Sequence, residues 1–314
     1  MNSLNTYRNL LFLFAFTFSL GSNAQLKDPT FWKPAVEKNK ARTNLVVFGG
    51  GGAAVITLAG LYSIWYLEYP QSEIHSTNDW DNWMQMDKIG HANVSYVVGQ
   101  SGYDAFKWAG WSEKKAVWHG GMVGFTYLTA VEIMDGFSDG WGFSWGDMAF
   151  NTLGAGLFIG QQLGWKEQRI LLKFSYHNTE HPPYNKDGLL GTGGLQNIIK
   201  NYNGQTYWLS VNPRSFTKEK MAFWPKWLNV AGGYGATGMI GATQNPSYPD
   251  EIDKEFVRHR QYYLSLDIDL RKIPMKSGFL KTLVHTLSFI KIPAPTVQFN
   301  GSQNGGTTFH WLYF

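Results

Sequence analysis

Hydrophobic and polar positions follow a helical period in the first half of the chain and an alternating period after Trp165. Apolar residues recur every three to four positions in amphipathic helices and at every second position in half-buried strands. The first half therefore predicts four helices, over Leu45–Leu67, Lys88–Ala109, Glu113–Asp135 and Trp145–Trp165.

The first of these segments carries no charged residue between Leu45 and Leu67. A run of this length can span a bilayer, for which about 20 apolar residues are needed. It can equally form a buried helix of a bundle, and the sequence leaves both alternatives open. In water, Gly49–Gly52 would weaken the helix by about 1 kcal/mol per glycine relative to alanine.

Small residues recur at helical spacing in the later helices. Gly120 and Gly124 are four positions apart, and so are Gly156, Gly160 and Gly164. Such spacing places small residues on one helix face and lets neighbouring backbones approach closely. We therefore predict a Gly-rich four-helix bundle, either embedded in a membrane or packed in water.

The second half reads as short strands of alternating polarity. In "RILLKFSYH" the apolar side chains share one face, and Lys173 and Ser175 lie on the other. The segments "QTYWLSV", "LNVAGGYGATGMIGA", "QYYLSLDIDL", "PTVQFN" and "TTFHWLYF" are further strand candidates, and one amphipathic helix near Gly278–Ile290 interrupts them. About six strands are visible, whereas a membrane barrel needs about eight. The fold class is therefore α+β, with an antiparallel sheet or, as the alternative, a partial barrel.

Composition narrows the class of partner. Charged residues make up only 16% of the 314 residues, aromatic residues also reach 16%, and there are 35 glycines. This balance suits a protein that meets a membrane or packs its helices very closely, and we expect a membrane as a partner. The net charge of +4 is scattered without a Lys/Arg block, so we expect no nucleic-acid binding, and no protein partner is indicated. The sequence contains no cysteine, which excludes disulfides and a lipidated cysteine.

The N-terminus has the layout of an export signal. Arg8 provides a basic start, Leu10–Leu20 an apolar core, and Ser22–Ala24 a small-residue cleavage pattern. The alternative is a retained N-terminal anchor. We predict a signal peptide over residues 1–24, a linker over 25–44, a helical domain over 45–165 and a β-rich domain over 166–314. The mature protein should lie in the cell envelope, in the periplasm or at the inner or outer membrane.

Polar residues at the edges of the predicted helices are candidate site residues, namely Asp87, Lys88, His91, Glu132, Asp147 and Asn151. Asp87 and His91 are four apart, as are Asp147 and Asn151, so each pair shares one helix face. Buried charges are costly unless paired, so we expect the two stripes and Glu132 to converge in one pocket. The Asp87 carboxylate should lie near the His91 ring and raise its pKa.

Two kinds of chemistry fit this set. A histidine beside carboxylates suits general acid–base catalysis, with Lys88 facing an anionic group. The same set suits a divalent cation held by Asp87, His91, Glu132 and Asp147. Taken singly, each residue can instead be structural, as a helix cap or as a hydrogen-bonded core amide.

The segments "DKIGH" and "VEIMDGFSDGWGFSWGDMAFNTLGAG" resemble the uncharacterised bacterial envelope family that includes the predicted periplasmic lipoprotein YfiM. The shared features are Asp-Lys-x-x-His, a Glu in the second helix, a Gly-rich turn, and Ser-Trp-x-Asp opening the last helix. More distantly the pattern is similar to VanZ-like membrane proteins, whose Asp-x-x-x-Asn-x-x-Gly corresponds here to Asp147, Asn151 and Gly154. The resemblance covers about Asp87–Trp165.

The resemblance implies an envelope location but no established activity, and VanZ-like proteins are linked to glycopeptide tolerance. This sequence departs from YfiM in lacking a lipidation cysteine and in adding the whole C-terminal half, as larger Bacteroidetes-type members do. We therefore predict an envelope protein with a structural or assembly role, in which the polar cluster fixes helix packing. The alternative is an envelope enzyme acting on a lipid-linked or cell-wall substrate, and the sequence does not decide between them.

Overall fold

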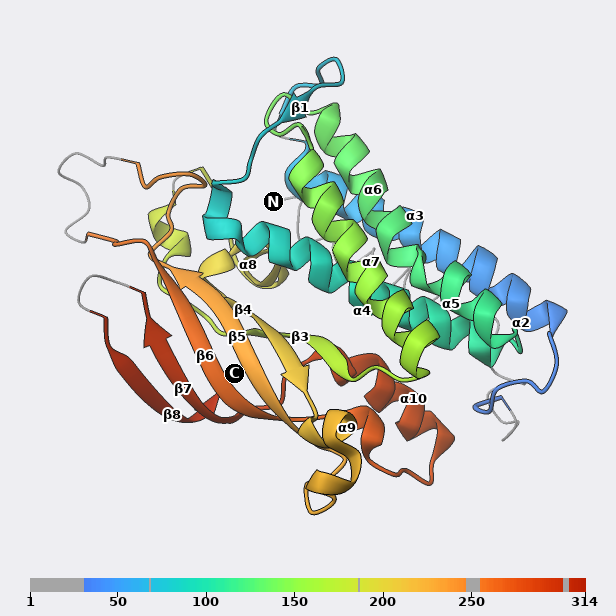
Figure 1. The fold of residues 1–314 in the computed structure, drawn as a ribbon. Helices are drawn as coiled ribbons and strands as arrows, with labels where there is room; N and C mark the ends of the chain where they lie inside the picture. The colour runs from blue at the N-terminus through green and yellow to red at the C-terminus, as the bar shows by residue number, and fades with distance from the viewer. Residues whose placement is uncertain (1–30, 68, 186, 247–254, 302–304) are drawn as a thin grey trace.

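The computed structural model describes residues 31–67, 69–185, 187–246, 255–301 and 305–314; the predicted signal peptide and its cleavage site lie outside them. Helices form one side of the molecule and an antiparallel sheet forms the other (Figure 1). The predicted α+β class with an antiparallel sheet is therefore confirmed. The helices are α2 (Lys40–Asn44), α3 (Gly50–Trp65), α4 (Met86–Trp108), α5 (Glu113–Gly121), α6 (Val123–Gly136), α7 (Trp145–Trp165), α8 (Leu195–Lys200), α9 (Pro213–Thr217) and α10 (Gly278–Thr286).

The strands form two sheets. Two short strands, β1 (Ser76–Thr77) and β2 (Phe143–Ser144), pair in parallel. The large sheet is a meander in which each strand pairs antiparallel with the next, in the order β3 (Ile170–Tyr176), β4 (Gln205–Val211), β5 (Leu228–Thr237), β6 (His259–Ile268), β7 (Ala294–Asn300) and β8 (Thr307–Tyr313).

Most of the predicted uncharged segment lies within a longer continuous helix, Lys40–Trp65. In this helix a π-helical turn at Leu45–Gly49 joins α2 to α3. By length and composition this helix is able to cross a membrane, and its mean hydropathy is 1.8. None of its residues is buried, so the alternative of a buried bundle helix is wrong. The helix touches α6 along part of one side, but the rest of its apolar surface is left exposed by the described chain.

The helical core lies around α4, which packs against α5, α6 and α7. The predicted helix Glu113–Asp135 is instead two helices that meet at Met122. Two consecutive glycines, Gly120 and Gly121, precede this break and lower the helix propensity there. The core thus consists of α4, α5, α6 and α7. The four helices predicted from the sequence instead included α3 and treated α5 and α6 as one helix.

The glycines at helix spacing fall into two groups. A β-carbon on Gly124 would collide with the carbonyl oxygen of Ser95, and one on Gly154 with that of Ala92, so both glycines lie directly against α4. By contrast, nothing lies within 4 Å of a β-carbon built on Gly156, Gly160 or Gly164. The prediction that this second stripe brings helices together is wrong, because it faces away from the packed side of α7.

The large sheet buries its polar face. Lys173 and Asp267 are almost fully buried and form an ion pair, with 2.7 Å between Nζ and Oδ2. Ser210 donates from Oγ to the same Asp267 oxygen at 2.6 Å. On the other face Leu264 is 51% exposed and Trp311 is 79% exposed. The buried face of the sheet therefore carries charged and hydroxyl groups beside the aromatic cluster of Trp208, Tyr263 and Tyr313. Part of the exposed face is apolar, unlike that of an ordinary water-soluble sheet.

Lys291 lies in this interior, with its ammonium 4.6 Å from the centre of the Trp208 ring. Its Nζ donates to the carbonyl oxygen of Ile292 at 3.1 Å. Burial lowers the pKa of Lys291 to about 8, against the opposing effect of the Asp267 carboxylate. The segment around it also pairs with the far edge of the sheet, because Ile290 bridges to Phe174 of β3.

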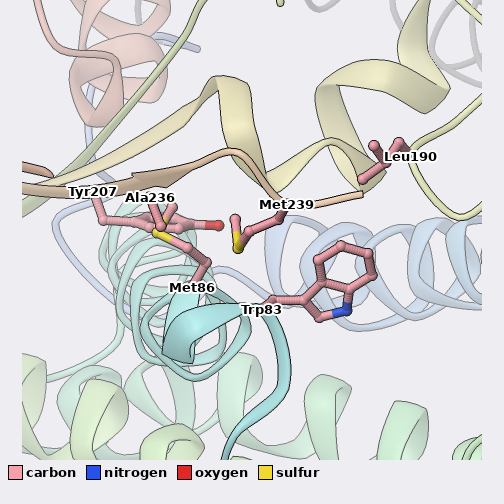
Figure 2. Close-up of a cluster of buried hydrophobic side chains, with 6 residues drawn as sticks. All are labelled: Trp83, Met86, Leu190, Tyr207, Ala236 and Met239. Atoms are coloured by element: carbon pink, nitrogen blue, oxygen red, sulfur yellow. The ribbon is translucent and has the colours of Figure 1, made fainter. Parts of the chain in front are cut away.

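A hydrophobic cluster joins the sheet to the start of α4 (Figure 2). Trp83 and Met86 reach from the helical side toward Tyr207 on β4 and Met239 beyond β5. Leu190 and Ala236 complete the cluster. This cluster fixes the first turn of α4 against the sheet, and the polar site begins one residue later.

The two glycine groups predict opposite effects of the same substitution. Gly154→Ala should lower the free energy of unfolding by about 1–3 kcal/mol, because α7 must move away from α4. Gly156→Ala should raise it by about 0.5–1 kcal/mol, because alanine has the higher helix propensity and meets open space. Urea unfolding followed by circular dichroism measures both, and equal effects would contradict the packing described here.

Lys291 predicts a specific pH dependence of stability. Its pKa is lower in the fold than in the unfolded chain, so the folded state holds fewer protons between about pH 8 and pH 10.5. Stability from this group therefore rises with pH across that window, and charged Lys291 destabilises the fold below it. Lys291→Met should raise the free energy of unfolding at pH 7 by about 1–3 kcal/mol, and the gain should shrink by pH 10. The control is Lys281→Met, which replaces an exposed lysine and should leave the free energy of unfolding unchanged at both pH 7 and pH 10.

Candidate functional site

An unusual turn precedes α4 and shapes the site. Trp83, Met84 and Gln85 have positive φ angles of 49°, 52° and 64°. Residues other than glycine adopt such angles at a cost of about 1–3 kcal/mol each, so the surroundings must hold them. The hydroxyl of Tyr234 donates to the Met84 carbonyl at 2.6 Å, and Arg260 donates to Gln85 Oε1 at 2.7 Å. The sheet thus holds the turn that leads from Asp79 into α4.

Lys88 is the centre of the site. Its side chain is fully buried, and Nζ lies 2.6 Å from Asp79 Oδ2 and 2.9 Å from Asp147 Oδ1. A third carboxylate oxygen, Oδ2 of Asp87, is 3.5 Å away. One buried ammonium therefore pairs with carboxylates from the loop before α4, from α4 itself and from α7.

Ser144 connects three of the surrounding elements at the start of α7. Its Oγ donates to Asp79 Oδ1 at 2.6 Å and accepts the backbone N–H of Asp147 at 3.1 Å, as an N-cap does. Its own backbone N–H donates to Glu132 Oε2 on α6 at 3.1 Å. The cap therefore also positions Asp147 and Glu132 for the site.

His91 lies between α6 and α7 and is partly accessible. Its Nδ1 is 3.1 Å from Asn151 Oδ1, which accepts the Nδ1 proton, and 3.5 Å from Glu132 Oε1. Its Nε2 is 3.8 Å from Asp87 Oδ1. Asp87 in turn accepts a 2.6 Å hydrogen bond from the hydroxyl of Tyr202, in the second half of the chain.

The clustering of acids changes their proton affinity. Burial raises the pKa of Glu132 to about 8, opposed by His91 and reinforced by Asp147. Burial and the Asp87 carboxylate raise the pKa of Asp147 to about 7. Burial lowers the pKa of His91, but the charges of the three surrounding carboxylates outweigh it and raise the value overall. Part of the cluster therefore exchanges protons near neutral pH.

The cluster carries more acids than bases. Asp79, Asp87, Glu132 and Asp147 face a single lysine and one histidine. In addition Glu132 is almost fully buried and its Oε1 has no hydrogen-bond partner among the described residues. Protonation relieves this surplus, because Glu132 with a pKa of about 8 and Asp147 with a pKa of about 7 can each hold a proton near neutral pH.

The structure allows a test of the predicted cation site. One ligand atom each from Asp87, His91 and Asp147 lie within 4.8 Å of one another, a spacing that suits a divalent cation. However, the Lys88 ammonium already lies against the carboxylates of Asp87 and Asp147. A metal ion would have to displace it, so the residues fit a metal poorly in this arrangement. A divalent cation at this site stays a prediction.

The structure brings the sequence-predicted site residues together in one cluster, namely Asp87, Lys88, His91, Glu132, Asp147 and Asn151. Sequence reasoning missed Asp79 and Tyr202. Asp79 belongs to a loop without helical periodicity, and Tyr202 is remote in sequence, so no spacing rule points to either. Asp135, three residues after Glu132 on α6, accepts a 2.6 Å hydrogen bond from Tyr66 at the end of α3.

The charge excess predicts unequal effects for two substitutions that each remove one buried ionisable group. Lys88→Met should lower the free energy of unfolding at pH 7 by about 3–5 kcal/mol, because it leaves buried carboxylates without a counter-charge. Glu132→Gln should change it by less than about 1 kcal/mol, because a group with a pKa of about 8 is already largely neutral there. Urea unfolding of both variants checks this. Equal losses would indicate a charge-balanced network instead.

Comparison with known proteins gives one match. Residues 79–159 match the model of a family described as "Predicted periplasmic lipoprotein (DUF2279)", a span well under half of the chain. No curated protein and no solved structure matches. The matched span begins at Asp79 and includes every site residue except Tyr202. It supports an uncharacterised envelope family and an exported, envelope location for this chain, whose sequence has no cysteine to carry a lipid.

Proposed function

We propose that this chain is a membrane-attached envelope enzyme that carries out acid–base chemistry on a cell-wall or lipid-linked substrate. The observation that carries the proposal is the unbalanced acid cluster around Lys88 and the partly accessible His91. Residues kept in a costly arrangement are characteristic of functional sites, where stability is lost in exchange for chemistry. The YfiM-like and VanZ-like pattern of Asp, Lys, His, Glu, Asp and Asn supports the same centre.

Each residue has a role that follows from its position. His91 accepts the proton, because Asn151 binds Nδ1 and leaves Nε2 toward Asp87. The side chains of His91 and Asp87 are 15% and 21% exposed, so a substrate atom can approach them. Glu132 is buried behind the ring and holds or releases a proton near neutral pH. Asp87, fixed by Tyr202, orients the imidazole.

The positive charge of Lys88 gives the centre its polarity. Its ammonium lies behind the carboxylates of Asp79 and Asp147 and is fully buried. From there it lowers the cost of keeping those acids ionised, and the pKa of Asp79 is accordingly lowered. Lys88 is thus a positioning residue for the acids rather than a group that meets substrate.

Attachment to a membrane rests on the helix Lys40–Trp65. It is long and apolar enough to cross a bilayer, and none of it is buried. Its C-terminal end connects to the helical core, because Tyr66 donates to Asp135 of α6. An anchor in this place would hold the site close to the membrane surface, where lipid-linked envelope precursors are accessible.

A structural or assembly role is the second candidate, and one observation favours it. Tyr202 binds Asp87 across the two halves of the chain, so the cluster also fixes how they pack. In this alternative the polar groups matter for folding alone. The two functions differ in what removal of the imidazole should do.

Replacement of His91 separates the candidates. In a strain lacking the gene, His91→Gln should fold with a thermal midpoint close to that of the original protein but fail to restore function. Mass spectrometry of cell-wall digests and of extracted lipids should show the same accumulated species as in the strain without the gene. A general base contributes about 10²–10⁴-fold to a rate, so restoration should be lost almost fully.

The control is His119→Gln, which changes an exposed histidine on α5 and should restore the original profile. If folded His91→Gln protein restores the profile as well as His119→Gln does, the enzyme proposal is wrong and the structural role stands. A loss of folding in His91→Gln alone would also favour the structural role.

A further inference from the structure

A cavity of about 470 Å³ opens beside the polar site. It is lined by Ser76–Trp80, together with Trp145 and Gly146 at the start of α7. Small-molecule sites commonly have volumes of about 300–1,000 Å³, so this space accommodates a ring-sized ligand. Asp79 belongs to its wall and to the Lys88 cluster alike, so the cavity adjoins the acid–base centre.

Two tryptophans in the lining are unusually exposed for so large a side chain. Trp80 is 51% exposed and Trp145 is 71% exposed. Each ring packs edge-to-face with a neighbour, Trp80 with Phe150 and Trp145 with Phe143. Exposed aromatic rings in a formed cavity are contact surfaces for a ligand, because burying them there releases water.

The remaining lining is polar and short. Ser76, Thr77 and Asn78 supply hydroxyl and amide groups, and the Asp79 carboxylate adds acceptor oxygens. Asp79 already binds Ser144 and Lys88, but a lipid tail would strip water from the hydroxyl groups of Ser76 and Thr77, which is costly. A sugar ring suits them, because its faces carry C–H groups that pack on indole and its edge carries hydroxyls that bind amide, hydroxyl and carboxylate groups.

The missing side chain of Gly146 keeps the cavity close to the charged centre. A β-carbon at this position would lie 3.1 Å from Lys88 Cε and would fill the wall between cavity and lysine. The parallel pairing of Ser76 with Phe143 and of Thr77 with Ser144 holds the two walls together. The cavity is therefore built from the same segments that position Asp79 and Ser144.

We infer that this cavity is a saccharide subsite, in which Trp80 and Trp145 pack on a sugar ring and Asp79 binds its hydroxyls. A saccharide in this cavity would make the substrate of the proposed enzyme an envelope glycan or a glycan joined to a lipid. In that respect the inference rests on the proposed function. The sugar would occupy the cavity next to Asp79, on the side of the molecule where Asp79 meets the Lys88 cluster.

Isothermal titration calorimetry with chitotriose tests the inference on the full mature chain in a detergent without a sugar headgroup. The original protein should bind, and Trp145→Ala should weaken binding at least tenfold, as loss of a central aromatic contact does. The control is Trp118→Ala, which removes an exposed indole from α5, outside the cavity lining, and should bind as the original does. His91→Gln should also bind, because the subsite lies beside the acid–base centre.

The outcomes separate the two proposals. Absence of chitotriose binding at millimolar concentration, or equal affinity of Trp145→Ala and Trp118→Ala, overturns the saccharide subsite and leaves the acid–base proposal to its own test. If vesicles of phosphatidylethanolamine and phosphatidylglycerol shield the Trp145 indole from water while no sugar binds, the two indoles are lipid contacts. The saccharide subsite is then wrong as well. If the sugar binds and His91→Gln fully restores function in the strain lacking the gene, the saccharide subsite stands and the enzyme proposal is wrong.

Discussion

The burial of one lysine among carboxylates is the interaction on which the helical half depends. Lys88 can be buried only if Asp79 and Asp147 lie within ion-pair distance of its ammonium. That requirement fixes the loop before α4 over the start of α7. The left-handed turn at Trp83–Gln85, the Ser144 cap and the close approach at Gly154 all serve this geometry.

The second half of the chain solves a different problem. Its sheet encloses polar residues, including the Lys173–Asp267 pair, and exposes leucines and aromatics on part of the opposite face. The Trp83 cluster covers one end of that apolar face with the start of α4, and Tyr202 reaches back to Asp87. The sheet thereby stabilises both the turn before α4 and one carboxylate of the site.

A centre with surplus buried acid differs from an ordinary ion-pair network. Burial, reinforced by neighbouring carboxylates, raises the pKa of Glu132 to about 8 and that of Asp147 to about 7. Neither of these two acids lines the cavity, but Asp79 belongs both to its wall, beside the exposed indoles of Trp80 and Trp145, and to the Lys88 cluster. Asp79 therefore connects the ligand-sized space to the acid cluster.

The sequence by itself determined the fold class and the set of polar groups that meet. Spacing placed Asp87 with His91 and Asp147 with Asn151 on single helix faces, because 3.6 residues per turn is a local property. Only the tertiary structure decided that Asp79 and Tyr202 join them, that Gly154 lies at a helix contact while Gly156 does not, and which face of the sheet is buried. Periodicity defines faces but not the partner that each face meets, since that partner comes from residues distant in the chain.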